Sequence, residues 1–131
     1  MKFRYKKYSK GLLRPVIPIQ VEYQGRKVSY EVLLDSGSDS NIFHAALTPM
    51  LGINLKLGEK QLVGGIIFGQ MEPYWIHTVN IVVGGYRHEN IKVGFKNLST
   101  EGYGVVGQNG FFDLYIIKFD LKKGEIELKP R

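Results

Sequence analysis

One acidic residue in this chain stands where a carboxylate could do catalytic chemistry. Asp35 follows a continuously apolar run and opens a polar segment with the triplet Asp35-Ser36-Gly37. Peptide hydrolysis by carboxylates needs two of them around one water, sharing a proton because two negative charges so close together cannot both persist. The other aspartates lack a comparable setting: Asp39, Asp113 and Asp120. The second carboxylate must therefore come from a symmetry-related copy, which predicts a homodimer.

The neighbours of Asp35 suit this chemistry. Ser36 offers a hydroxyl that can lock the loop, and Gly37 lets the backbone turn close to the carboxylate. Ser38 is expected to donate a hydrogen bond to the carboxylate, which favours its charged form. The reaction needs no cofactor and no metal, and the histidines do not have the spacing of metal ligands: His44, His77 and His88.

The surrounding sequence is patterned as β-structure. Apolar residues alternate with polar ones, and turn formers separate the runs. We expect strands over 16–23, 26–34, 55–63, 75–83, 91–95, 115–121 and 125–128, with a buried pair at 105–106. Short helices are expected over 42–51, ending at Gly52, and over 107–114. The pattern predicts an all-β fold with one or two short helices.

Composition narrows the class of protein. The chain has 131 residues, enough for one domain, and a formal net charge of +6. Cysteine is absent, so disulfides and Cys-based zinc sites are excluded and a reducing compartment is favoured. The sequence shows neither a signal peptide nor an apolar run long enough to span a membrane, which predicts a cytoplasmic protein. We expect a basic N-terminal arm over 1–11, largely solvated, and a single domain over 12–131.

Several motifs together resemble those of retropepsin-like aspartic proteases, the single-domain, retroviral-type family. The run 33–40 is similar to the family's active-site motif, and 104–109 is similar to its second motif, Val105-Val106-Gly107, whose Gly packs beneath the catalytic loop. Arg14-Pro15 resembles the pair that precedes the first strand. The resemblance extends over residues 12–130, and the C-terminal part is most similar to prokaryotic cellular members.

The resemblance implies a closed acid-protease β-barrel that works as a symmetric homodimer on an extended peptide or protein substrate. It implies a flap over 62–74, whose tip is Gly64-Gly65-Ile66-Ile67-Phe68-Gly69. It also implies an ion pair between Arg14 and Asp39 at the dimer interface. Gln108 departs from the pattern, since retroviral members usually carry Arg at this position.

Two other classes of function stay open. One is a retropepsin-like domain that dimerises or binds with little activity, against which the intact Asp35-Ser36-Gly37 argues. The other is a small basic β-barrel that binds single-stranded nucleic acid. Such a barrel needs aromatic and cationic side chains interleaved on one sheet face, whereas the cations here are concentrated over 2–10.

Overall fold

The computed structural model describes residues 1–64, 71–98 and 102–131. The strands in these ranges are β1 (Lys2–Arg4), β2 (Lys6–Ser9), β3 (Leu12–Arg14), β4 (Val16–Tyr23), β5 (Arg26–Leu34), β6 (Asn41–His44), β7 (Glu59–Gly64), β8 (Met71–Val83), β9 (Tyr86–Lys96), β10 (Gly104–Val106), β11 (Tyr115–Asp120) and β12 (Glu125–Pro130). The helices are α1 (Leu47–Leu51) and a 3-10 turn, η1 (Leu55–Leu57). Neither helix is long enough to cross a lipid bilayer, within the described ranges.

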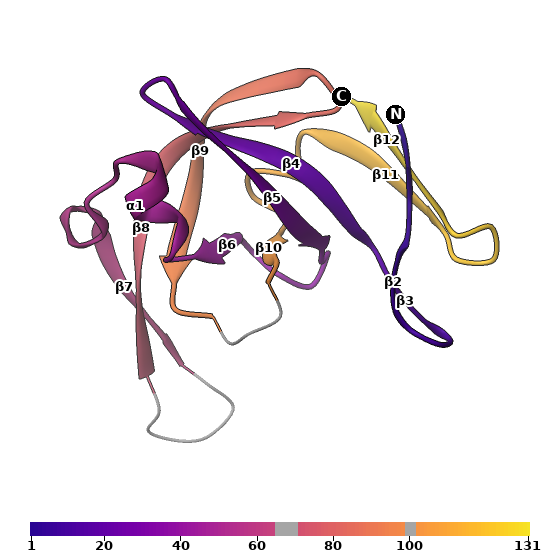
Figure 1. Cartoon of the computed structure of the whole chain (residues 1–131), viewed down its shortest axis with the longest axis horizontal. Helices are drawn as coiled ribbons and strands as arrows, with labels where there is room; N and C mark the ends of the chain where they lie inside the picture. Colours follow the sequence, from indigo (N-terminus) through magenta and orange to yellow (C-terminus); the bar gives the residue numbers. More distant parts are fainter. Residues whose placement is uncertain (65–70, 99–101) are drawn as a thin grey trace.

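Six strands close into a barrel in the order β4-β5-β10-β6-β9-β8, with β8 pairing back onto β4 (Figure 1). Strand β7 pairs only with the first half of β8, so this hairpin projects from the barrel. Two of the barrel pairings are parallel, β10 with β5 and β6 with β9. Parallel pairing brings β10 alongside β5 although 69 residues separate Leu34 from Gly104. The predicted closed, mostly β fold is confirmed.

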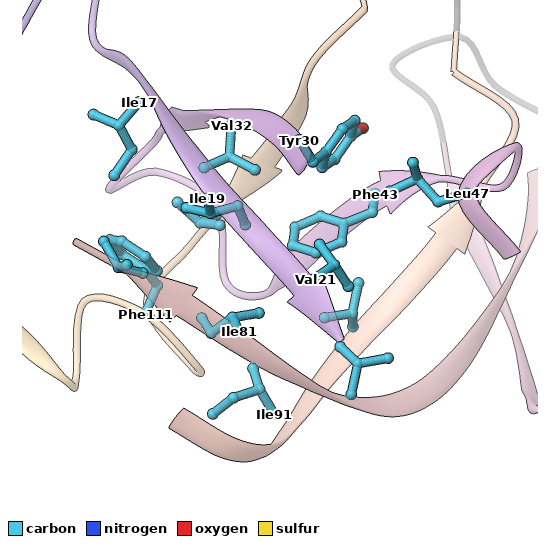
Figure 2. Close-up of a cluster of buried hydrophobic side chains, with 14 of the residues drawn as sticks. Ile17, Ile19, Val21, Tyr30, Val32, Phe43, Leu47, Ile81, Ile91 and Phe111 are labelled. Carbon is cyan, nitrogen blue, oxygen red and sulfur yellow. The ribbon is translucent and has the colours of Figure 1, made fainter. Parts of the chain in front are cut away.

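The barrel core follows from the alternation seen in the sequence. Strands β4 and β5 have the predicted bounds, and Ile17, Ile19 and Val21 are buried on one face of β4. Figure 2 shows these side chains packed with Val32 of β5 and Phe43 of β6. Each such side chain stabilises the fold by roughly 1.5–3 kcal/mol relative to leaving it in water. This packed interior gives the ends of β5, β6 and β10 a rigid base.

The structure corrects the helix predicted over 42–51. Its first residues belong to strand β6, in which Asn41 and Phe43 are fully buried and alternate with half-buried neighbours. The strand pairs with β10 on one side and β9 on the other. Helix α1 occupies only the last five residues of the predicted range, and it stops before Gly52, as predicted.

Other predicted elements differ in type or in their bounds. The segment 107–114 is a series of turns instead of a helix, because Gly110 has φ of 100° and cannot continue one. Strand β7 begins at Glu59, after η1, and not at Leu55 as expected. The expected strands over 75–83 and 91–95 are both longer in the structure, as β8 and β9.

The basic N-terminal segment is part of the folded chain and not a solvated arm. Strand β1 pairs with β12 in a three-stranded sheet beside the barrel, with Lys2 opposite Glu127 and Arg4 opposite Glu125. Strands β2 and β3 form a separate hairpin, so residue 11 lies in its turn. Opposite charges across the strands offset the repulsion within the basic segment.

A contact between β9 and β11 joins this sheet to the barrel. His88 Nε2 lies 2.5 Å from the Tyr115 hydroxyl, and the two rings meet edge to face at 5.1 Å. Burial, with a smaller contribution from Tyr86, raises the pKa of Tyr115 to about 12, so its hydroxyl keeps its proton and can donate. Burial also lowers the pKa of His88, which favours the neutral imidazole as the acceptor.

This contact predicts an acid-sensitive contribution to stability. Because the folded-state pKa of His88 lies below the unfolded value of 6.5, the contribution is complete above that pH and is lost as the pH falls from 6.5 through the lowered value. His88→Gln keeps a polar partner for Tyr115 but cannot titrate. Denaturant unfolding from about pH 8 to about pH 5 should therefore show a shallower loss for His88→Gln than for wild type, by at most about 1.4 kcal/mol per pH unit. Parallel curves would contradict this prediction.

Candidate active site

The candidate catalytic residue lies where β5 ends beside β10. Leu34 is paired with Val106, and the next residue, Asp35, donates its backbone N–H to the Val106 carbonyl at 3.1 Å. Leu34 and Val106 are buried, so both strands are anchored in the core up to this point. The structure thus brings the two sequence motifs into direct contact, as the resemblance implies.

The carboxylate of Asp35 is held by its own loop. Gly37 donates its N–H to Asp35 Oδ1 at 2.9 Å, and Ser38 donates its N–H to the Asp35 carbonyl at 3.1 Å. A Cβ on Gly37 would lie 3.2 Å from Asp35 Oδ1, so glycine permits this close approach, while its φ lies outside the left-handed region. Asp35 is half-buried, and Ser36 and Gly37 are exposed in the single chain.

Ser38 acts differently from the expectation. Its hydroxyl donates to the Ser40 carbonyl at 2.8 Å and not to the Asp35 carboxylate. A serine hydroxyl has one proton, so the bond within the loop uses its only donor. Ser38 therefore stiffens the loop beyond Asp35.

Gly107 of the second motif packs against the back of this loop. A Cβ at this position would lie 2.8 Å from the Ser40 carbonyl oxygen and closer still to that of Ser38, both of them backbone atoms. The Gly107 N–H donates to the side chain of Asn41 at 3.0 Å. The role that the resemblance implies for this glycine, packing beneath the catalytic loop, agrees with these distances.

Asn41 is the site residue that sequence reasoning missed. It directly follows the polar run 35–40, yet its side chain is fully buried and bridges two parts of the segment 106–110, called the second segment below. Its Oδ1 accepts from Gly107 N–H, and its Nδ2 donates to the Gly110 carbonyl at 3.2 Å. The available signal was the alternation of Asn41 with Phe43, which predicts an inward-facing amide at the start of a strand.

Two exposed amide side chains donate hydrogen bonds to the loop. Gln108 donates its backbone N–H to the Ser38 carbonyl at 2.9 Å and its side-chain Nε2 to the Ser36 carbonyl at 2.8 Å. Asn109 directs both its backbone N–H and its Nδ2 at the Asp39 carbonyl, each at 2.9 Å. Three carbonyls of the loop 35–40 thus accept hydrogen bonds from two consecutive residues, Gln108 and Asn109.

An apolar surface adjoins the carboxylate. Val105 of β10 is paired with Leu33 of β5 and with Ile42 of β6, which places the three side chains next to one another across three strands. All three are half-buried, unlike the core residues on either side of them. The sequence motifs included Leu33 and Val105 but not Ile42. This surface can contact an apolar side chain of a bound peptide.

A phenol lies beneath this surface. The Tyr30 hydroxyl accepts the backbone N–H of His44 at 3.1 Å, and burial raises the pKa of Tyr30 despite that bond. A Cβ on Gly104 would lie 2.7 Å from the Tyr30 ring. The buried ring thereby limits β10 to glycine at its first position.

Arg14 contacts two aromatic rings. Its guanidinium lies 5.0 Å from the centre of the Tyr8 ring and 5.9 Å from that of Tyr103, and it donates to the Tyr103 hydroxyl. Pro15, which follows, accepts the Leu34 N–H at 2.9 Å, so this residue lies close to the end of β5. The pair with Asp39 is expected across a dimer interface, so it stays a prediction.

The flap falls partly outside the described residues. Strands β7 and β8 form its expected stem, paired from Glu59 with Ile76 to Gly64 with Met71. The tip residues Gly65, Ile66, Ile67, Phe68 and Gly69 lie outside the described ranges, so their role stays a prediction. Within those ranges, His, Asp and Glu side chains nowhere gather in threes as metal ligands would.

The barrel, the paired motifs and the glycine beneath the loop define the retropepsin fold. Among solved structures, the chain is similar to a retropepsin-like aspartic protease from Rickettsia conorii, with a TM-score of 0.67 and 16% identity over 98% of this chain and 89% of that one. It is also similar to the EIAV protease in complex with the inhibitor HBY-793, with a TM-score of 0.50 and 19% identity over 78% of this chain and 88% of that one. Identities this low establish the fold alone.

Two sequence comparisons gave no match. No protein-family model matches the chain, and no curated protein matches it. The structural likeness, which spans almost the whole chain, was therefore visible in the sequence only through short motifs at fitting distances.

The buried amide of Asn41 yields a stability prediction. Asn41→Ala leaves the Gly107 N–H and the Gly110 carbonyl without their partner, which should lower the free energy of unfolding by about 2–3 kcal/mol. Asn80→Ala is the matched control, because Asn80 also accepts a backbone N–H, that of Asn90, but in an exposed setting. It should cost less than about 1 kcal/mol. Equal losses in denaturant unfolding would show that burial of the Asn41 amide is unimportant.

Proposed function

We propose that the protein is an aspartic endopeptidase that works as a symmetric homodimer with one Asp35 from each subunit. The observation that carries this proposal is the setting of Asp35: a half-buried carboxylate, at the end of a barrel strand, fixed by the Gly37 N–H and braced from behind by Gly107. Ordinary Asp-Ser-Gly turns have no such second segment beneath them. The retropepsin fold supports the same proposal.

The proposed chemistry follows from the pairing of two carboxylates. Close together they share one proton and titrate as a unit. The ionised member accepts a proton from a water molecule, which attacks the substrate carbonyl, while the protonated member donates to the carbonyl oxygen. When the tetrahedral intermediate collapses and its C–N bond breaks, the leaving amine takes the proton that the first carboxylate accepted from the water, and the second carboxylate regains a proton from a hydroxyl of the intermediate. No covalent intermediate forms with the enzyme.

Dimerisation supplies what one chain lacks. The catalytic loop presents Ser36, Gly37 and Asp39 to solvent in the single chain, which leaves this surface open to a second copy. A two-fold axis beside Asp35 places identical loops face to face, because an isologous interface puts each residue opposite itself. The peptide would then lie in extended form across both subunits, with an apolar side chain against Leu33 and Val105.

The proposal predicts a sharp loss of activity in Asp35→Asn. Cleavage of casein or a peptide library, assayed from about pH 3 to about pH 7, should fall about a thousandfold or more, because an amide can neither activate the water nor share a proton. Asp120→Asn is the matched control. Its Oδ1 accepts the Lys123 N–H in the β11–β12 turn, a bond that an asparagine oxygen retains, so activity should stay unchanged.

Sedimentation of wild type and Asp35→Asn under the assay conditions gives the mass of each, and so shows whether a loss of activity occurs in a dimer. A wild-type dimer that cleaves no peptide at any pH would leave the fold with a binding role only. Cleavage that survives in Asp35→Asn would contradict the assignment of the catalytic residue. A statine-type inhibitor should abolish the wild-type activity if a carboxylate pair carries it.

A further inference from the structure

One peptide unit of the catalytic loop connects Gln108 to the carboxylate. The unit between Ser36 and Gly37 accepts at its carbonyl from Gln108 Nε2, at 2.8 Å, and donates from its N–H to Asp35 Oδ1, at 2.9 Å. The carbonyl can only accept, so the side-chain amide must present its NH2 group. Gln108 is 72 residues away from Ser36 in the chain, so this bond is a tertiary contact.

A hydrogen bond at the carbonyl of a peptide unit acts on its N–H as well. It fixes the plane of the unit, which sets the direction of the N–H, and it polarises the unit so that the N–H becomes a stronger donor. We propose, building on the peptidase function proposed above, that Gln108 is a positioning residue that orients and strengthens the Gly37 N–H bond to the Asp35 carboxylate.

The backbone of Gln108 is fixed independently of its side chain. Its N–H donates to the Ser38 carbonyl at 2.9 Å, and its carbonyl accepts the Asp113 N–H at 3.1 Å. Gly107, which precedes it, is packed against the loop. The exposed side chain can therefore be changed while these main-chain bonds hold the segment in place. Its amide group is the part that acts on the Ser36–Gly37 peptide.

Gln108→Met tests this role, because methionine is similar in size and has no donor. We expect kcat to fall about tenfold, with KM changed less than about twofold, since Gln108 acts through the catalytic loop and not on the substrate. The acid limb of the pH–rate profile should move to higher pH, because a weaker bond to the charged carboxylate favours its protonated form. Gln20→Met, an exposed glutamine on β4, is the matched control and should match wild type.

Gln108→Glu gives a second readout that a purely structural role would not produce. A protonated glutamic acid can donate to the Ser36 carbonyl as glutamine does, whereas the ionised form cannot donate and repels the oxygen. The variant should therefore be closest to wild type at about pH 4 or below and lose activity progressively as the pH rises. A ratio of variant to wild-type activity that stays constant with pH would overturn the role.

A measurement without turnover separates this inference from the proposed function. In wild type, the amide proton of Gly37 should resonate downfield, as a proton bonded to a carboxylate does, and Gln108→Met should move it upfield. An unchanged Gly37 resonance would refute the coupling, whatever the activity. If the resonance moves but the wild-type dimer cleaves no peptide, the coupling stands and the peptidase proposal fails.

Discussion

The buried side chain of Asn41 is the interaction on which the site depends. It connects two segments far apart in the chain, since it accepts from Gly107, 66 residues away, and donates to Gly110, 69 residues away. Burying an amide costs free energy unless its hydrogen-bond partners are in place, so this contact forms only when the second segment is correctly positioned against β6. That position in turn packs Gly107 against the loop 35–40 and fixes where this loop leaves β5.

The loop 35–40 is held by hydrogen bonds of its own and by hydrogen bonds from one neighbouring segment. From residues 106–109, the Val106 carbonyl accepts the Asp35 N–H, and Gln108 and Asn109 donate to the carbonyls of Ser36, Ser38 and Asp39. Its outer side, with Ser36 and Gly37, is left exposed. Support from one side and exposure on the other is what the proposed catalytic role of Asp35 requires.

Much of the fold was predictable because local patterns sufficed. Strands β4 and β5 alternate clearly between apolar and polar residues, and their bounds were predicted correctly. The helix expected over 42–51 was wrong at its start because β6 is stabilised by pairing with β9 and β10, and its local sign, the alternation of Asn41 with Phe43, is short. The basic N-terminal segment was expected to be solvated because the glutamates that lie opposite Lys2 and Arg4 are near the other end of the chain, where no local pattern connects them.

The sequence motifs pointed to residues of the candidate site but did not predict the hydrogen bonds between them. Residue type pointed to Asp35 and Gly37, and the family resemblance pointed to Gly107. The Ser38 hydroxyl was expected to donate to the Asp35 carboxylate, but in the folded backbone it donates to the Ser40 carbonyl. Gln108 was noticed in the sequence as a departure from the retroviral pattern. Its contact with Ser36 required the tertiary structure, since the two residues belong to different motifs.

The central claim is that one Asp35 from each subunit forms the site. Dimers mixed from wild-type and Asp35→Asn chains test it most directly. Wild-type and Asp35→Asn chains, refolded together in equal amounts, form mixed dimers in which a single carboxylate cannot share a proton. At constant total chain concentration, activity should therefore fall to about one quarter of that of wild type alone, as the square of the wild-type fraction. A fall to only about one half, in proportion to the wild-type fraction, would mean that each chain carries a complete site and would contradict the account.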